Sequence, residues 1–557
     1  MTTTAPSDAA SAAPSPFSIP IFRAIWLASV SSNFGGLVQA VGASWLMTSL
    51  SDSSQDVALV QASTVLPIMM FSLLAGAIAD NLDRRLVMLS AQSFMIAISL
   101  LLALFAYNDW LSVWGLLAFT FAIGCGTALN NPAWQASVGD MVPRAALPGA
   151  VALNSMGFNI ARSVGPAIGG LIVAVAGAAA AFLTNALSYI GIIVVLLRWH
   201  PKRTPRTLPP ERLDVAMAAG LRYVSMSPNI RIVLLRGCVF GLAAAALPAL
   251  LPVVARDLIQ GGPLTYGILL GGFGIGAIGG ALSSGWARGH LTTEGIVRLA
   301  SVLLVIGAVG TGVSRAMALS VPALMVAGMG WVLALSTFNV SVQLSSPRWV
   351  VARALSLYQM ATFGGMSAGA WTCGAIAEEH GVTAALLVAA ATQAAGGLLG
   401  LVLPVPGTGQ EDLAPLNRWQ EPETAIPLRH TSGPIVITIE HRIQEADAAT
   451  FVQVMNERRR ICLRDGARGW TLLRDLADPE LWIERYHMPT WLEYVRDTQR
   501  RTRADLENFD RVRALHIDNH PPRVHRMIER PVGSASTTHT PSGREAGDPM
   551  TDPTRAS

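Results

Sequence analysis

The sequence predicts an all-α membrane protein of twelve transmembrane helices, arranged as two six-helix bundles and followed by an α+β ferredoxin-like domain. Of its 557 residues, 51% are hydrophobic and only 14% are charged, whereas soluble domains carry about a quarter charged residues. Long apolar runs fill the chain from residue 22 to residue 404, and residues 405–557 are dense in Arg, Asp and Glu. The chain therefore has one part suited to lipid and another suited to water.

Twelve apolar segments are each long enough to cross a bilayer. A hydrocarbon core about 30 Å thick needs roughly twenty helical residues. The segments show no alternation of apolar and polar residues, and an open strand would leave its backbone groups unpaired in lipid. The expected helices cover residues 22–49, 57–79, 86–106, 110–138, 147–176, 179–197, 232–255, 264–286, 296–314, 317–342, 351–377 and 382–403.

The connections between these segments define the domain organisation. The longest connection is basic and rich in Pro, so we interpret it as a cytoplasmic linker between two bundles. The ends of the chain have compositions typical of disorder. The expected divisions are a disordered arm (1–20), the N-terminal bundle (21–197), the central linker (198–231), the C-terminal bundle (232–404), a second linker (405–430), the folded domain (431–530) and a disordered tail (531–557).

Basic residues gather in the loops that follow even-numbered helices, for example at Arg84, Arg85, Arg198 and Arg288. Loops rich in Lys and Arg stay in the cytoplasm. With an even number of helices, we expect both termini to be cytoplasmic in a multi-pass protein of the plasma (inner) membrane.

A polar motif stands at the end of the second predicted helix. Gly76 and Asp80 precede Arg84 and Arg85, so a carboxylate and two guanidinium groups lie at the membrane boundary, where they can bridge neighbouring helices. Asp140, at the end of the fourth helix, is the expected partner of one arginine. Anchoring of the loop by its positive charge is the alternative interpretation.

The two halves share spacings, which is typical of transporters built from repeats. Glycines are common in this chain, but the matched positions fall on equivalent helices. The matches are Gly76, Asp80 and Arg84 with Gly280, Ser284 and Arg288, and Asn159, Gly165 and Gly169 with Gln359, Gly365 and Gly369.

The fifth predicted helix carries an arginine and a glycine-rich motif. Gly165 and Pro166 loosen the helix backbone, and Gly169 and Gly170 allow close helix packing. Arg162 is costly inside a bilayer unless it faces a cavity or a partner. We expect Arg162 to line a central cavity; snorkelling of its side chain to the membrane surface is the alternative.

Amide and indole side chains on several helices are the other candidates for a substrate cavity. On the fifth helix they share a face with Arg162, and a phenolate or carboxylate group on the cargo would suit that face. Hydrogen bonds that join helices are the alternative role. The candidates are Asn33, Gln39, Trp134, Gln135, Asn154, Asn159, Arg162 and Gln359.

The motif at Gly76 resembles the signature loop of the major facilitator superfamily, although Asp83 stands at the usual second glycine. The motif at Arg162 resembles that superfamily's antiporter signature, with Ala161 at its first glycine. The runs 130–135 and 151–159 resemble the enterobactin-exporter-like, or transmembrane secretion effector, branch. The resemblance implies a conformational latch at Gly76, Asp80, Arg84, Arg85 and Asp140. It also implies export of a siderophore-like or drug-like molecule by alternating access between the bundles.

The energy source is constrained by what the sequence lacks. No Asp or Glu lies near the centre of any predicted helix, so proton coupling is implied by the resemblance alone, without an identified carrier. No ATP-binding loop occurs, which favours secondary transport. We expect no cofactor, no metal and no nucleic acid, and the expected partners are the lipid bilayer, a small-molecule cargo and, as an open alternative, protons.

The domain at 431–530 has the pattern βαββαβ of a ferredoxin-like sandwich. Strands are expected at 435–440, 469–475, 481–487 and 522–528, and helices at 446–464 and 491–515. The domain resembles the antibiotic-biosynthesis-monooxygenase-like fold, which implies self-association. His441, Trp482 and His487 could serve catalysis, but isolated residues of this kind are more often structural. The alternatives to an exporter with a regulatory domain are a bifunctional protein that modifies its cargo and a non-transporting sensor.

Overall fold

The computed structural model describes residues 16–143, 146–200, 213–347, 349–407, 413, 424–518 and 520–529. The chain divides into two compact units. The first unit comprises Met1–Met217, Arg231–Val342 and Leu355–Gly407, and the second comprises Ala218–Ile230, Gln343–Ala354 and Thr408–Ser557. The C-terminal domain therefore shares its unit with two short segments from earlier in the chain.

Long helices form the first unit, and polar residues begin several of them. The side chains of Ser53, Asp83 and Ser112 accept hydrogen bonds from backbone N–H groups in the first turns of α2, α3 and α4, as helix N-caps do. The helices of the first half, after a 3₁₀ turn at Pro16–Ser18, are α1 (Pro20–Leu50), α2 (Ser54–Asn81), α3 (Arg84–Tyr107), α4 (Val113–Met141) and α5 (Leu147–Arg198).

The second half begins with shorter helices and continues with long ones. The central linker contains a helix that the sequence did not lead us to expect, α6 (Leu213–Met226). After it come α7 (Pro228–Ala244), α8 (Ala246–Val253), a π-helical turn (Val254–Leu258), α9 (Pro263–His290), α10 (Thr293–Val313), α11 (Met317–Leu344) and α12 (Val351–Leu399).

Two of these helices are too long to cross a membrane once. At 1.5 Å per residue, the 49 residues of α12 would extend about 73 Å, more than twice the hydrocarbon thickness. Each long helix is two helices joined at a glycine with positive φ, Gly177 in α5 (79°) and Gly381 in α12 (84°). The predicted boundaries at 176/179 and 377/382 bracket these glycines.

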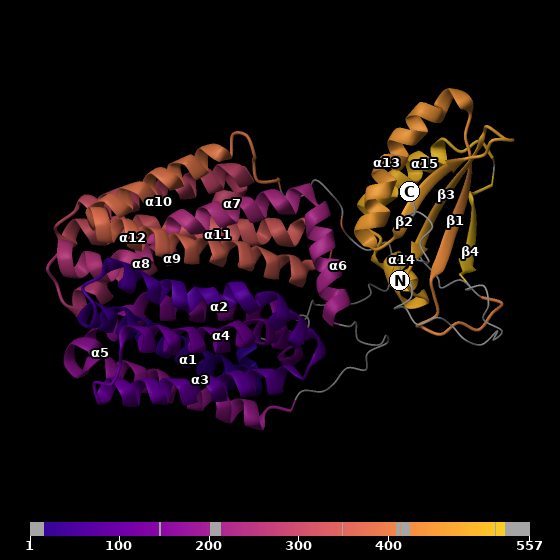
Figure 1. Ribbon diagram of the computed structural model, residues 1–557. Helices are drawn as coiled ribbons and strands as arrows, with labels where there is room; N and C mark the ends of the chain where they lie inside the picture. The colour runs from indigo at the N-terminus through magenta and orange to yellow at the C-terminus, as the bar shows by residue number, and fades with distance from the viewer. Residues whose placement is uncertain are drawn as a thin grey trace, which may run out of the picture. The chain divides into compact units, whose positions relative to one another are not determined.

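Within the described residues, ten helices are long and apolar enough to span a membrane. In the first half, α1 packs on α5, α2 on α4, and α3 on both α4 and α5. Figure 1 shows α1–α4 on one side of this unit and α7 and α9–α12 on the other, and α5 packs against α9 between the halves. Large apolar side chains such as Val175 (79% exposed) and Leu282 (80% exposed) cover the outside of the helices, as expected of a surface in contact with lipid.

The second unit contains a four-stranded antiparallel sheet in the order β2-β3-β1-β4. Its helices lie on one face of the sheet (Figure 1). Alternate residues of β1 and β3, including Ile437, Ile439 and Tyr486, point to that face and are buried. The elements are β1 (Ile435–Arg442), a 3₁₀ turn (Glu445–Asp447), α13 (Ala448–Asp465), β2 (Arg468–Arg474), β3 (Leu481–Met488), α14 (Trp491–Arg500), α15 (Arg503–Ala514) and β4 (Arg523–Ile528).

The pattern βαββαβ differs from expectation in one element. The predicted helix over 491–515 is two helices, α14 and α15. Thr502 begins the second one with a capping box, in which Thr502 and Asp505 satisfy each other's backbone N–H groups. Such a box stabilises a helix start, so the local sequence favours a new helix over the continuation of the first.

Candidate functional site

Arg162 lies on α5, where α5 faces the second half of the helical unit. Its guanidinium carbon is 5.6 Å from the ring centroid of Phe273 on α9 and 5.8 Å from that of Trp331 on α11. Both distances fall within the range of cation–π attraction. None of the acidic side chains that the structure describes forms an ion pair with Arg162. The arginine thus contacts the facing half through aromatic rings.

These rings begin a row of buried aromatic side chains in the second half. Phe273 and Trp331 meet edge to face with centroids 5.7 Å apart. The row continues from Trp331 to Phe240, to Phe338 and to Tyr358, with centroid separations of 6.2, 5.8 and 6.5 Å. Sequence reasoning missed these residues, because an aromatic side chain within an apolar run looks the same whether it faces lipid or the protein interior.

Small residues allow α5 and α9 to approach closely in the turns of α5 that follow Arg162. A Cβ atom on Gly170 would lie 2.6 Å from the carbonyl oxygen of Pro263, and one on Gly267 would lie 2.6 Å from that of Pro166. Gly165 and Gly169 face α1 instead, against Leu37 and Val38. The glycines of the predicted helix-five motif therefore serve two helix contacts, one inside the first half and one between halves.

Gln39 belongs to a polar network inside the first half. Its side-chain oxygen accepts hydrogen bonds from Ser99 on α3 (3.1 Å) and from Asn185 in the second leg of α5. Asn185 also lies 3.2 Å from the Tyr189 hydroxyl. Gln39 is only 5% exposed, so its contacts hold three helix segments together, which is the alternative role that its sequence left open.

The other predicted cavity residues occupy varied positions. Trp134 packs against the apolar core of the first half. Asn33 and Gln135 are exposed, and Asn154 and Gln359 are half-buried. The side chain of Asn159 lies outside the described residues. The structure thus brings Arg162 together with aromatic rings and does not show the predicted amides gathered around it.

The predicted latch is described in part. Gly76 faces the Ser356 hydroxyl on α12, and the side chains of Asp80 and Asp140 lie outside the described residues. Arg85 donates hydrogen bonds to the carbonyl oxygens of Leu196 (2.7 Å) and Leu197 (2.8 Å) at the end of α5. For Arg85, therefore, the described partners are backbone carbonyls, where a cation is favourable at a helix C-terminus.

In the second half, the repeat of this motif forms a contact within α9. Arg288 donates a hydrogen bond to the Ser284 hydroxyl at 3.2 Å, four residues earlier. Gly280 packs closely on the backbone of Met329. The equivalent residues of the two halves thus serve different contacts.

Two polar contacts join the halves where α2 begins, and neither pairing could be read from the sequence. The backbone N–H of Ser54 donates to Glu378 Oε2 at 2.6 Å, which places a carboxylate at the N-terminus of α2. Arg256, paired with Asp257, donates from Nη1 to the carbonyl oxygen of Thr48 at 3.1 Å. These contacts connect the two halves at this end of the helical unit.

A buried charge cluster in the second half was also missed. Glu294, at the start of α10, lies 3.2 Å from both Arg236 and Arg298 and accepts a hydrogen bond from the backbone N–H of Val405. Arg298 also donates to the carbonyl oxygen of Gly400. Because these partners follow α12, the cluster fixes the end of that helix to α7 and α10.

In the second unit, the three residues considered for catalysis are divided by the sheet. Residues opposite each other across β1 and β3 share a face, and His441 is opposite Trp482. Both face the helices. His487 is five residues from Trp482, so its side chain projects from the other face. The two histidines therefore cannot act on one bound molecule.

The comparison with protein families covers almost the whole chain, since the transmembrane secretion effector family model matches residues 11–532. The Staphyloferrin A transporter of Staphylococcus aureus is 25% identical over 245 residues, 44% of this chain and 62% of that transporter. The multidrug efflux pump Tap of Mycolicibacterium fortuitum is 25% identical over 397 residues, 68% of this chain and 95% of the pump. The chain spans less than two thirds of the first of these relatives.

Solved transporters share the helical fold. The POT family transporter PepTSo gives a TM-score of 0.56 at 13% identity, covering 69% of this chain and 97% of that one. An inward-facing bacterial homologue of the lysosomal transporter Spinster gives 0.52 at 12% identity, covering 69% and 94%. The chain belongs to the transmembrane secretion effector family and is a multi-pass membrane protein of the major facilitator type.

Proposed function

We propose that this protein is a secondary active exporter of a siderophore-like or drug-like small molecule that carries an anionic group. The observation that carries the proposal is Arg162, a cation placed between the halves with aromatic rings as its described neighbours. A cation inside the helical unit that has no carboxylate partner among the described residues favours an anion, and the rings offer apolar surface to the rest of the cargo. Two relatives, the Staphyloferrin A transporter and the multidrug efflux pump Tap, support cargo of this kind by what they are named for.

In the proposed topology the chain crosses the plasma membrane twelve times. The two helices that break at Gly177 and Gly381 each supply two crossings, which raises the ten candidate spans to twelve. The basic loops then place both termini in the cytoplasm, and the contacts of Glu378 and Arg256 at the outer side.

In the proposed transport cycle the two halves rock about Arg162. Contacts at Gly170 and Gly267, and at Glu378 and Ser54, would hold the outer side closed. At the cytoplasmic side, the residues at the start of α3 would act together with Asp80 and Asp140. These residues would stabilise one of the two facing states of the cycle. Alternation of this kind is the general mechanism of such folds.

The test is transport into inverted membrane vesicles. Staphyloferrin A and a macrolide serve as the two cargo probes, each measured with and without an imposed pH gradient. We expect saturable uptake of the anionic siderophore. Uptake of the macrolide alone, whose amine is cationic, would contradict the anionic group in the proposal. Acceleration by an acidic interior would add proton antiport to the proposal. Vesicles lacking the protein are the control. If both probes enter these vesicles as fast as they enter vesicles that contain the protein, export of this cargo class is contradicted.

A further inference from the structure

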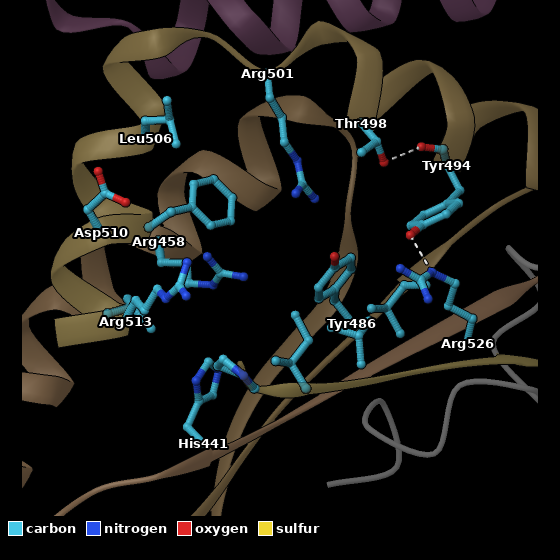
Figure 2. Close-up of a pocket in the computed structure, with 16 residues that line it drawn as sticks. His441, Arg458, Tyr486, Tyr494, Thr498, Arg501, Leu506, Asp510, Arg513 and Arg526 are labelled. Carbon is cyan, nitrogen blue, oxygen red and sulfur yellow. Dashed lines mark hydrogen bonds between the residues drawn. The ribbon is translucent and has the colours of Figure 1, made fainter. Parts of the chain in front are cut away.

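The second unit contains a cavity of ≈ 400 Å³ between the sheet and its helices. This volume lies in the range of small-molecule sites. Ile437 and Ile439 form its floor on β1, and Tyr486 lies beside them on β3. Figure 2 shows side chains from α13, α14 and α15 surrounding the same space, with Arg501 pointing into it from above. The cavity lies wholly within the C-terminal domain.

Positive charge dominates the walls. Four arginines line the cavity, Arg458, Arg501, Arg513 and Arg526, against one acidic side chain, Asp510. Arg458 is neutralised, because its Nε donates to the buried Glu484 at 2.6 Å. Burial opposes ionisation of Glu484, but Arg458 and neighbouring hydrogen-bond donors outweigh it and lower the pKa of Glu484 to about 2.

The other arginines are less fully compensated. Arg526 on β4 donates from Nε to the Tyr494 hydroxyl at 2.7 Å, which is a neutral partner. Arg501 lies 3.9 Å from Asp497, and burial together with nearby Asp465 raises the pKa of Asp497 to about 7. Near neutral pH that carboxyl group is therefore only partly charged, and the cavity keeps a surplus of positive charge.

A buried histidine adds an unused hydrogen-bonding group. His441 is 1% exposed and lines the cavity. Its Nε2 lies 3.5 Å from Glu484 Oε2, and its Nδ1 has no hydrogen-bond partner among the described residues. A buried polar atom without a partner is costly, and a ligand in the cavity would satisfy it.

We propose that this cavity is a binding site for an apolar or aromatic small molecule with a carboxylate or similar anionic group. Guanidinium groups bind carboxylates through charge-assisted hydrogen bonds, and Arg526 and Arg501 present them from opposite walls. Phe509, which lies under the guanidinium groups of Arg458 (4.4 Å) and Arg501 (5.0 Å), and the two tyrosines hold the apolar body. This site is separate from Arg162, and the proposal does not depend on export.

The test is equilibrium dialysis of the full-length protein in lipid nanodiscs with 2-naphthoate as the probe. The protein carries Arg162→Gln, so that the helical unit does not contribute a second anion site. Uncharged 2-naphthamide has the same shape and reports partition into lipid. We expect one saturable naphthoate site per chain and at least tenfold weaker binding of the amide. Equal binding of the two probes would overturn the proposal.

Matched variants locate the site. Arg526→Gln removes a charge from the cavity and should weaken naphthoate binding about tenfold, as expected for the loss of a charge-assisted hydrogen bond. Arg523→Gln removes the same charge from the opposite face of β4 and should leave binding unchanged. Loss of binding in Arg523→Gln equal to that in Arg526→Gln, or no loss in Arg526→Gln, would refute an anion site here.

Discussion

Arg162 stands among apolar residues of α5, and its described contacts are the rings of Phe273 and Trp331. A cation at such a position costs a few kcal/mol or more. Ring contacts recover about 0.5–2 kcal/mol each, so they offset only part of that cost. The remaining cost is consistent with a residue retained for its interaction with cargo.

Arg162→Gln should therefore reduce transport of an anionic cargo at least tenfold, and Arg162→Lys should retain part of it, because lysine keeps the charge but loses the planar guanidinium. Initial uptake rates in inverted vesicles measure the effect. Arg315→Gln, which removes an exposed arginine between α10 and α11, is the charge-matched control. Wild-type transport by Arg162→Gln would remove Arg162 from the cargo path.

Asp497 makes the stability of the C-terminal domain depend on pH. Burial raises its pKa in the folded state to about 7, from an ordinary value of 3.8. Between these two values the folded state holds a proton that the unfolded state releases, so stability falls as pH rises from about 4 to about 7. Asp497→Asn should reduce this dependence, part of which belongs to the buried neighbour Asp465, whose pKa burial also raises, and should be more stable than the wild type at pH 8.

Hydrogen exchange of the β1 and β3 amides, corrected for the intrinsic effect of pH on exchange, measures this stability. Glu507→Gln changes an exposed carboxylate on α15 and is the control. The same pH dependence in Asp497→Asn and in the wild type would assign it to other groups.

The sequence predicts that Arg162 lines a cavity because a charge within an apolar run is rare and has a physical cost. It could not identify Phe273 or Trp331, since nothing local separates an aromatic residue that faces lipid from one that faces the protein. Gln39 shows the complementary limit. Its amide was recognised as unusual, but only the positions of Ser99 and Asn185 show that it joins helices.

At the scale of elements, α5 and α9 depend on the absence of side chains at their contact. Gly170→Ala would place a methyl group 2.6 Å from a backbone oxygen and 3.0 Å from a backbone carbon. Neither atom can move without shifting its helix. Overpacking of this kind costs about 1–3 kcal/mol, and here it should act against the state in which the two helices touch.

We expect Gly170→Ala to lower the melting temperature of the protein and to slow transport. Gly285→Ala, on the partner helix α9, meets no atom within 4 Å and is the control that should behave as the wild type. Thermal unfolding in detergent and vesicle uptake measure the two effects. Equal melting temperatures and equal uptake rates for both variants would mean that the close contact between α5 and α9 contributes neither to stability nor to transport.

Glu378 connects the two halves through the N-terminus of α2, a contact that holds the outer side closed in the proposed transport cycle. Glu378→Ala removes the acceptor of the Ser54 N–H and should shift the protein toward a state open at this end. A cysteine introduced at the buried Ala58, which lies against Gly374, should then react faster with a membrane-impermeant maleimide in a background without the four native cysteines. Glu379→Ala, the control, removes a neighbouring carboxylate that is largely exposed and should leave the rate of the maleimide reaction unchanged. A comparable increase in Glu379→Ala would show that the Glu378 contact does not control access at this end.

Most elements could be predicted because their signals are local. The length of the apolar segments predicts the membrane spans, and the alternation of apolar and polar residues predicts β1. The glycines at 177 and 381 lie where the predicted spans divide. The break between α14 and α15 was also local, in the Thr502 capping box, but helical periodicity on both sides concealed it. Helix α6 was missed because its 14 residues lie within a basic connection that resembles a linker.

For the whole molecule, the division of the chain into compact units differs from its division along the sequence. Residues 218–230 and 343–354 belong to the unit that contains the C-terminal domain. Within that unit, Arg222 donates to the carbonyl oxygen of Arg464 at 3.2 Å, and the Arg464 guanidinium lies 5.1 Å from the Tyr223 ring. Arg500 lies 4.3 Å from the ring of Trp349. The C-terminal domain thus holds two segments that lead directly into membrane helices α7 and α12.

Removal of the chain from Thr408 onward should consequently have a local effect. The long helices bury their own contacts within the first unit and should remain folded. Segments 218–230 and 343–354 should exchange amide hydrogens faster, because Tyr223 and Trp349 lose cation–π contacts worth about 0.5–2 kcal/mol each. Hydrogen exchange with mass spectrometry measures both regions at once. Removal from Pro531 onward deletes none of the described contacts and serves as the control. Unchanged exchange in both segments after the longer deletion would show that the C-terminal domain does not restrain them. Faster exchange confined to these segments would show that the domain stabilises the starts of α7 and α12.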